Sequence, residues 1–167
     1  MQLHYFDFVP PPGWNGFRLG RQVRLLPPNT PPADARCAII VSPLLPRSAV
    51  LPPADTLITQ TLEAECGLTK AEVLAKNGPM PTSSDHGLAG VYFDVQLNSP
   101  TLLTTVHERR LYVLLVDELC YYGLNYLSEN ATFAEHEATF WTAVRTIKPF
   151  SGRIASPSGE PYGHYGE

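Results

Sequence analysis

Residues 110–150 read RLYVLLVDELCYYGLNYLSENATFAEHEATFWTAVRTIKPF and decide the fold. Two runs in this stretch, residues 111–118 and 119–127, are rich in β-branched, aromatic and aliphatic side chains, as is typical of strands. Asp117 and Glu118 suit the turn that would join the two runs as a hairpin. Side chains alternate between the two faces of a strand, and both sets in the first run are apolar, so we expect that strand to be covered on both faces.

One amphipathic helix is predicted after the hairpin. Thr132 and Glu135 have the spacing of a capping box, in which each side chain bonds a free backbone N–H of the first helical turn. Lys148 and Pro149 are expected to end the helix, because lysine suits its negative end and the residue before a proline avoids the helical region. Apolar side chains recur at helical spacing and are expected to pack on the sheet: Phe133, Phe140, Val144 and Ile147, with Trp141 beside them.

Three strands are expected in the N-terminal part of the chain, at residues 3–9, 22–26 and 37–41. The third, CAIIV, is wholly apolar and is predicted to be a buried central strand. Prolines or glycine follow each of these runs and would end the strands. Trp14 and Phe17 are expected in a loop between the first two strands.

A helix is predicted in the middle of the chain, opened by Pro53 and closed by Gly67. Residues 68–76 fit either a short helix or a strand, and the pattern does not choose between them. Further strands are expected at residues 88–97 and 102–109, and the second would lead into the hairpin described above.

The composition predicts one domain with a sizeable core. The chain has 167 residues, of which 44% are hydrophobic, and we expect a single domain over residues 1–150 with a tail over residues 151–167. The net charge of -4 without a basic block argues against a nucleic-acid partner. No run reaches the roughly 20 apolar residues that span a bilayer, so no membrane span is expected.

The cysteines and the N-terminus bear on the cellular compartment. Cys37, Cys66 and Cys120 lie far apart and form no CxxC pair, so we expect buried free thiols rather than a disulfide framework. The N-terminus has no signal-peptide pattern. A cytoplasmic protein is therefore expected, and the alternative is a periplasmic or exported protein whose signal was removed.

No catalytic or metal-binding pattern stands out. Cys120 could form a thiol triad with His107 and Asp117, but strand alternation predicts that this thiol is buried and therefore inert. His136 and Glu137 are adjacent, and neighbours on a helix point about 100° apart, which disfavours a shared metal ion. We therefore expect no catalytic residue, no cofactor and no metal, and a protein that is not an enzyme.

The chain resembles the Mog1/PsbP-like superfamily, including the DcrB-type domains. The resemblance rests on an opening YFDFVPPPGW at residues 5–14, and on a late strand followed by a helix with the pattern Phe133-x6-Phe140-x6-Ile147. It covers about residues 3–150 and implies an α+β fold: a three-layer α/β/α sandwich around a mostly antiparallel sheet. Members of this superfamily are mostly non-enzymatic: a Ran-binding factor, photosystem accessory proteins, lipoproteins, and bacterial chaperones for type VI secretion effectors.

The functional prediction is a protein-binding adaptor or chaperone-like protein that recognises a hydrophobic segment of a partner, including a secretion-system effector. If two helices do not cover both faces of the sheet, an apolar groove is left as the partner site, and a homodimer is a further use of such a face. The alternatives are a small enzyme or ligand-binding protein with an unrecognised pocket, and an exported accessory lipoprotein-type domain. The competing interpretation of the candidate aromatic residues is that they fill the core. They are Tyr112, Tyr121, Tyr122 and Tyr126, with Trp14 and Phe17 as an exposed-loop alternative.

Overall fold

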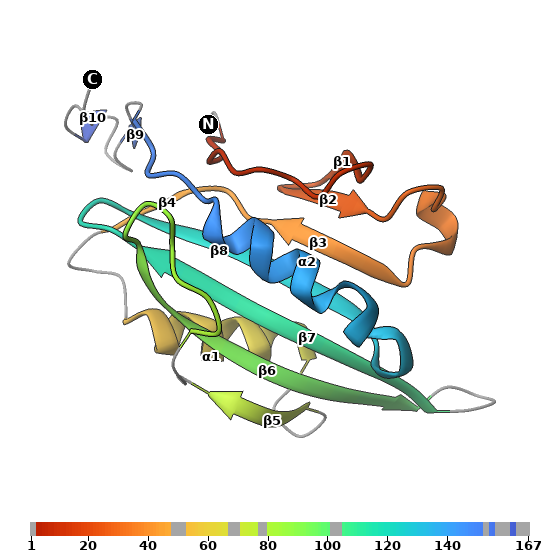
Figure 1. The fold of residues 1–167 in the computed structure, drawn as a ribbon. Helices are drawn as coiled ribbons and strands as arrows, with labels where there is room; N and C mark the ends of the chain where they lie inside the picture. The colour runs from red at the N-terminus through yellow and green to blue at the C-terminus, as the bar shows by residue number, and fades with distance from the viewer. Residues whose placement is uncertain are drawn as a thin grey trace.

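An antiparallel sheet and two α-helices make up most of the described chain (Figure 1). The computed structural model describes residues 3–47, 53–66, 71–76, 80–100, 105–151, 154–155 and 161–162. The helices are α1 (Ala54–Cys66) and α2 (Ala134–Arg145). The strands are β1 (Asn15–Leu19), β2 (Gln22–Leu26), β3 (Cys37–Val41), β4 (Leu45–Pro46), β5 (Ala71–Lys76), β6 (Ala89–Pro100), β7 (Thr105–Val116), β8 (Cys120–Glu129), β9 (Ile154–Ala155) and β10 (Pro161–Tyr162).

The sheet has the strand order β1-β2-β3-β8-β7-β6-β5, and every neighbouring pair is antiparallel. The short strand β4 pairs with β8 outside this order. The meander β6-β7-β8 holds the longest strands, and its last turn is the predicted one: the Asp117 carboxylate accepts hydrogen bonds from the backbone N–H groups of Leu119 and Cys120, both at 2.8 Å. The α+β class and the antiparallel sheet are therefore confirmed.

The larger core lies between the sheet and α2. Every second side chain of β3, β7 and β8 points to this face, and the N-terminal segment adds Phe6. In Figure 1, α2 crosses one face of the sheet over β7 and β8. The helix contributes the apolar positions that its periodicity predicted: Phe140, Trp141, Val144 and, just beyond its end, Ile147.

The smaller core lies on the opposite face, under α1. Ile58 of α1 packs against the buried side chains Phe93, Val95 and Leu97 of β6 and against Tyr112 and Leu114 of β7. Because α1 has 13 residues and packs at the β6 side of the sheet, it covers only part of this face. Apolar side chains on both faces of β7 were predicted, and the structure buries both sets.

Several predicted elements are confirmed. Strands β2 and β3 have the predicted bounds, and α1 occupies the predicted helix position. For residues 71–76 the strand alternative holds, because β5 pairs with β6 at the sheet edge. Residues 67–70 lie outside the described part of the chain.

The predicted strand at residues 3–9 was wrong. This segment bonds two different elements instead of one strand: the His4 carbonyl accepts from Leu44 N–H, and the Asp7 carbonyl accepts from Lys148 N–H. The predicted loop around Phe17 was also wrong, because Phe17 lies in β1. The β1–β2 turn includes Gly20 with φ of +61°, a conformation that glycine adopts without a steric penalty.

The predicted strands at residues 102–109 and 111–118 are one strand, β7, in the part that the structure describes from residue 105. The two predicted ranges left Arg110 between them. In β7 both neighbouring arginines are paired, Arg109 with Asp94 at 2.5 Å and Arg110 with Glu108. Residues 102–104 lie outside the described part.

The predicted capping box does not form. A 3-10 turn, Asn130–Thr132, precedes α2, and the N-cap position falls on Phe133, one residue after Thr132. The Thr132 hydroxyl instead bonds the Ser128 hydroxyl at 3.1 Å and the Glu129 carbonyl at 3.4 Å. The helix ends at Arg145, before the predicted end at Lys148. In the predicted tail, β9 and β10 pair with each other, and the rest of the tail beyond residue 151 lies outside the described residues.

Candidate functional site: a half-covered sheet face

The α1 face of the sheet carries a row of side chains that α1 covers only at one end. Cross-strand register places Arg24 opposite Ile40, Ile40 opposite Asn125, Asn125 opposite Tyr112, and Tyr112 opposite Phe93. Paired residues in an antiparallel sheet lie on the same face, so this row crosses the sheet from β2 to β6. The Phe93 end is buried under α1, and the Arg24 end lies beyond this helix.

Two hollows adjoin on this face. The first, of about 470 Å³, lies over β2, β3, β8 and β7, and the second, of about 180 Å³, lies between these strands and α1. Gln22, Tyr112 and Asn125 line both hollows, so they form one continuous depression. We call it the sheet groove and define it by the residues that line the two hollows.

Charged side chains stand at one end of the sheet groove. Arg36 pairs with Glu129 at 2.6 Å, and Arg110 pairs with Glu108 and donates to the Tyr112 hydroxyl at 3.1 Å. Arg36 is largely exposed, whereas Arg110 and Glu108 are half-buried on the strand. These ion pairs neutralise most of the charge at this end of the groove.

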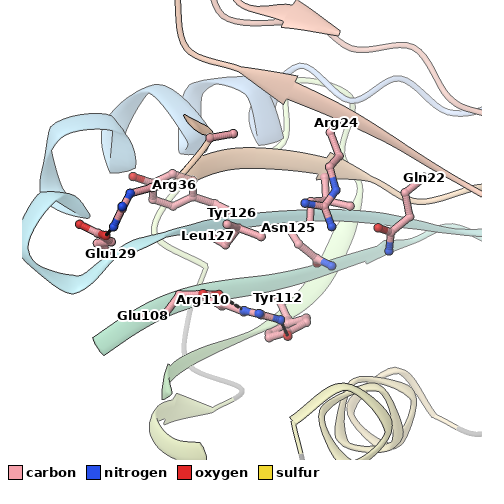
Figure 2. A pocket seen from close by; sticks show the side chains of 12 residues that line it. Gln22, Arg24, Arg36, Glu108, Arg110, Tyr112, Asn125, Tyr126, Leu127 and Glu129 are labelled. Atoms are coloured by element: carbon pink, nitrogen blue, oxygen red, sulfur yellow. Dashed lines mark hydrogen bonds and ion pairs between the residues drawn. The ribbon is translucent and has the colours of Figure 1, made fainter. Parts of the chain in front are cut away.

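Three polar side chains line the middle of the groove, Gln22 and Arg24 of β2 and Asn125 of β8, and Figure 2 shows Arg24 reaching toward Asn125. All three are half-buried. None of their side chains makes a hydrogen bond to another described residue, and the Nε atom of Arg24 is buried without an acceptor. We call these three residues the polar floor. A buried donor without an acceptor costs roughly 1–3 kcal/mol, so native proteins rarely keep one without reason.

The other end of the groove is apolar. Leu57 and Ile58 of α1 form its wall, and Pro43 and Leu45 stand across from them. Gly123 of β8 lies on the floor beside Ser42, and a Cβ atom at this glycine would lie 3.2 Å from the Ser42 Cβ. The absence of a side chain at Gly123 therefore keeps this end of the groove open.

Two of the predicted partner-binding tyrosines lie in the α2 core. Tyr122 and Tyr126 are both 0% exposed, although Tyr126 is also one of the residues that line the first hollow. The Tyr122 hydroxyl donates to Asp117 at 2.6 Å and accepts from the Phe150 N–H at 2.8 Å, and the Tyr126 hydroxyl donates to the Phe133 carbonyl at 2.8 Å. For these two side chains the core-filling interpretation describes what the structure shows, since α2 covers them.

The other predicted residues have different surroundings. Tyr112 and Tyr121 line the sheet groove, although only 3% and 6% of their surfaces are exposed. Phe17 is opposite Arg24 in the β1–β2 pair, which places it on the groove face at the outer edge of the sheet. Trp14 lies on the α2 side, where its ring meets that of His136 edge-on at 5.3 Å. The structure thus divides the six candidates between two faces.

Sequence reasoning missed the polar floor. A usable signal was present in β2, where Gln22 and Arg24 alternate with the apolar Val23 and Leu25. In β8, Asn125 lies between Gly123 and Leu127 on a face that begins with Tyr121 and ends with Glu129. Alternation showed that these polar groups share a face in each strand, but only the β2-β3-β8 register brings the two strands' groups together.

The thiol triad of Cys120, His107 and Asp117 does not form in the structure. Burial raises the pKa of the Cys120 thiol from 9.0 to about 12, which keeps it protonated. His107 lies near the opposite end of β7 from this turn, and its Nδ1 atom meets the Asn98 side-chain oxygen at 2.6 Å. Within the described ranges, no group of three or more His, Cys, Asp and Glu side chains could hold a metal ion. No helix of the described residues is long and apolar enough to cross a membrane.

The comparisons show a fold likeness. No protein-family model and no curated protein matches the chain. The structure is similar to PA94 from Pseudomonas aeruginosa, a protein of unknown function suggested to be a regulator, with a TM-score of 0.52 and 17% identity over 82% of this chain and 97% of that one. It is also similar to a protein from Bacteroides thetaiotaomicron, with a TM-score of 0.52 and 11% identity over 87% of this chain and 45% of that one, so the match spans less than half of the Bacteroides chain. At these identities, the likeness shows the fold alone.

Proposed function

We propose that this protein is a non-catalytic adaptor or chaperone-like protein that holds a segment of a partner protein in the sheet groove. The proposal includes membership of the Mog1/PsbP-like superfamily, with α1 and α2 as the outer layers of a three-layer α/β/α sandwich. The resemblance suggests a secretion-system effector as the partner. The free thiols of Cys37 and Cys120 suit a cytoplasmic protein.

One observation carries the proposal: the sheet groove is open and is lined by two kinds of surface. The apolar end, with Leu57 and Ile58, would cover hydrophobic side chains of the segment. The polar floor would bond its backbone or polar side chains. Small-molecule sites are usually enclosed and mostly apolar, whereas protein interfaces combine an apolar core with a polar rim. The open shape and mixed lining therefore favour a protein segment.

The test is to block the groove with a bulky side chain at one of the residues that line it. In Asn125→Trp, a bulky ring would replace a half-buried amide that lines both hollows. The matched control is His86→Trp, which places the same ring at an exposed position of the loop before β6. Each variant and the wild-type protein would serve as bait in the native host, and captured proteins would be measured by quantitative mass spectrometry.

We expect the wild-type protein and His86→Trp to capture one partner in stoichiometric amount. Asn125→Trp should lose this partner by at least about tenfold, because a filled groove removes contacts worth more than about 1.4 kcal/mol. Circular dichroism and the thermal midpoint show whether the variant is folded. Equal capture by a folded Asn125→Trp would refute the groove as the partner site.

A further inference from the structure

The charges of the first hollow leave one cation without a counter-charge. Its lining includes three arginines, Arg24, Arg36 and Arg110, and two carboxylates, Glu108 and Glu129. The two carboxylates each pair with an arginine, Glu129 with Arg36 and Glu108 with Arg110. Arg24 is the remaining charge, and it has no acceptor among the described residues.

Arg24 differs in this respect from the other arginines that lie on the sheet or against it. Arg47 donates to the Asp117 carbonyl at 3.1 Å, Arg109 bonds both carboxylate oxygens of Asp94, and Arg145 bonds Asp85. In Figure 2, the Arg24 side chain lies over β3 and reaches toward Asn125 instead of extending away from the sheet. Partial burial of a guanidinium costs desolvation free energy, and without an acceptor no hydrogen bond offsets that cost.

We propose that Arg24 receives an Asp or Glu side chain of the partner segment that occupies the sheet groove. This inference rests on the proposed function and adds the chemistry that the partner must carry. A guanidinium offers parallel N–H groups that match the two oxygens of a carboxylate. The amides of Gln22 and Asn125 line the same hollow as Arg24 and can donate to the remaining lone pairs of that carboxylate.

The lining of the groove also indicates which residues should flank the acidic residue of the partner segment. The apolar end lies beyond Gln22 and Asn125 from the charged end, so the acidic residue should be flanked on one side by apolar residues that reach Leu57 and Ile58. A free phosphate suits this place less well, because the lining of this hollow carries one cation in excess of its carboxylates, whereas phosphate is a dianion. A hollow of about 470 Å³ is also much larger than such an ion.

The experiment selects short random peptides from a display library on the 167-residue chain. Selection on the wild-type protein is compared with selection on Asn125→Trp, which reports groove binding, and on Arg24→Gln, which keeps a polar side chain but removes the charge. Arg21→Gln is the matched control, because Arg21 is an exposed residue of the β1–β2 turn. A peptide recovered on the wild-type protein is then synthesised with Glu and, as a twin, with Gln at the selected acidic position.

We expect wild-type and Arg21→Gln proteins to enrich peptides with one Asp or Glu beside apolar residues. The Glu peptide should bind the wild-type protein about tenfold more tightly than its Gln twin, as expected for one charge-assisted hydrogen-bonded pair. On Arg24→Gln this difference should disappear, and Arg24→Lys should restore part of it, because lysine keeps the charge without the planar fork. The thermal midpoint of Arg24→Gln should not fall, since no internal bond is lost.

The outcomes separate this inference from the proposed function. Groove-dependent peptides without an acidic preference, or with the same preference on Arg24→Gln, overturn the role of Arg24 and leave the adaptor proposal standing. If no peptide prefers the wild-type protein to Asn125→Trp, both fail. Inorganic phosphate titrated alone should not bind saturably. Saturable phosphate binding that Arg24→Gln abolishes would make this an anion site and overturn the assignment to a protein side chain.

Discussion

At the scale of single residues, burial separates side chains that looked alike in the sequence. Tyr121 and Tyr122 are adjacent, yet one lines the sheet groove and the other lies under α2 with two hydrogen bonds. Strand alternation predicts that neighbours point to opposite faces. Which face is open follows from where α1 and α2 pack, and no property of a single tyrosine reports that.

The Cys120 thiol should be chemically silent in the folded protein. Burial raises its pKa from 9.0 to about 12, so at neutral pH the reactive thiolate should be roughly a thousandfold scarcer than in the unfolded chain. Treatment with iodoacetamide, followed by mass mapping of the peptide that contains Cys120, should show no labelling before unfolding and full labelling in denaturant. Rapid labelling of the native protein would contradict the buried position.

The same raised pKa has a consequence for stability. The unfolded thiol begins to ionise near pH 9.0 and the folded one only near 12, so its contribution to stability is complete below pH 9.0. That contribution is lost as the pH rises from 9.0 toward 12. Urea unfolding over this range should show a smaller alkaline loss for Cys120→Ala than for the wild-type protein. An equal loss in both proteins would assign it to other groups, among them Tyr122, whose pKa burial also raises.

At the scale of elements, local sequence patterns predicted both helices and the strands β2, β3, β6, β7 and β8. Strand β3 and helix α2 carry their apolar patterns within a few residues, and such patterns are independent of the rest of the chain. Some errors fell where distant residues decide, as at residues 3–9, which bond two elements from elsewhere in the chain. Others were local, as at Thr132, where a 3-10 turn precedes α2.

Gly90 is expected to be essential for the β6–β7 pairing. A Cβ atom at this position would lie 2.8 Å from the Leu114 carbonyl oxygen and would overlap the Leu115 side chain. Because a paired backbone carbonyl cannot move away without breaking the ladder, Gly90→Ala should lower the free energy of unfolding by about 2–3 kcal/mol, as overpacking does. Urea denaturation measures this change.

Gly16→Ala is the control for that substitution. Gly16 is also in a strand, but its nearest neighbour would be the end of the Leu25 side chain at 2.9 Å, which can rotate away. We expect Gly16→Ala to cost under about 1 kcal/mol. If both variants lost the same free energy of unfolding, replacing a strand glycine would be costly in itself, and the contact with the Leu114 carbonyl would not explain the loss.

At the scale of the whole molecule, the two ends of the domain close the larger core together. The N-terminal segment contacts the end of α2, where Lys148 N–H donates to the Asp7 carbonyl at 2.9 Å and Val9 N–H donates to the Thr146 hydroxyl at 2.8 Å. Figure 1 shows the start of the chain above β8 and near this end of the helix. Phe6 is buried here, with its ring 5.5 Å from that of Tyr122.

Phe6→Ala should destabilise the entire fold. Removing a buried phenylalanine ring costs about 3–5 kcal/mol, and here it also leaves a void beneath the contact between the two ends. We expect a single, cooperative unfolding transition at lower urea concentration, measured by both fluorescence and circular dichroism. Val9→Ala, at a position that is 59% exposed, should change the stability by under about 0.5 kcal/mol. If Phe6→Ala released only the N-terminal segment and left the stability of the sheet unchanged, the two ends would not close the larger core together.

Local patterns in the sequence were enough to predict the α+β class, the strand runs on both sides of the Asp117 turn and the apolar face of α2, because each rests on a periodic pattern within one segment. Tertiary structure alone decided the candidate site. The polar floor joins Gln22 and Arg24 of β2 to Asn125 of β8 across β3, about a hundred residues apart along the chain. Strand order and register create that proximity, and they arise from long-range pairing that no local pattern encodes.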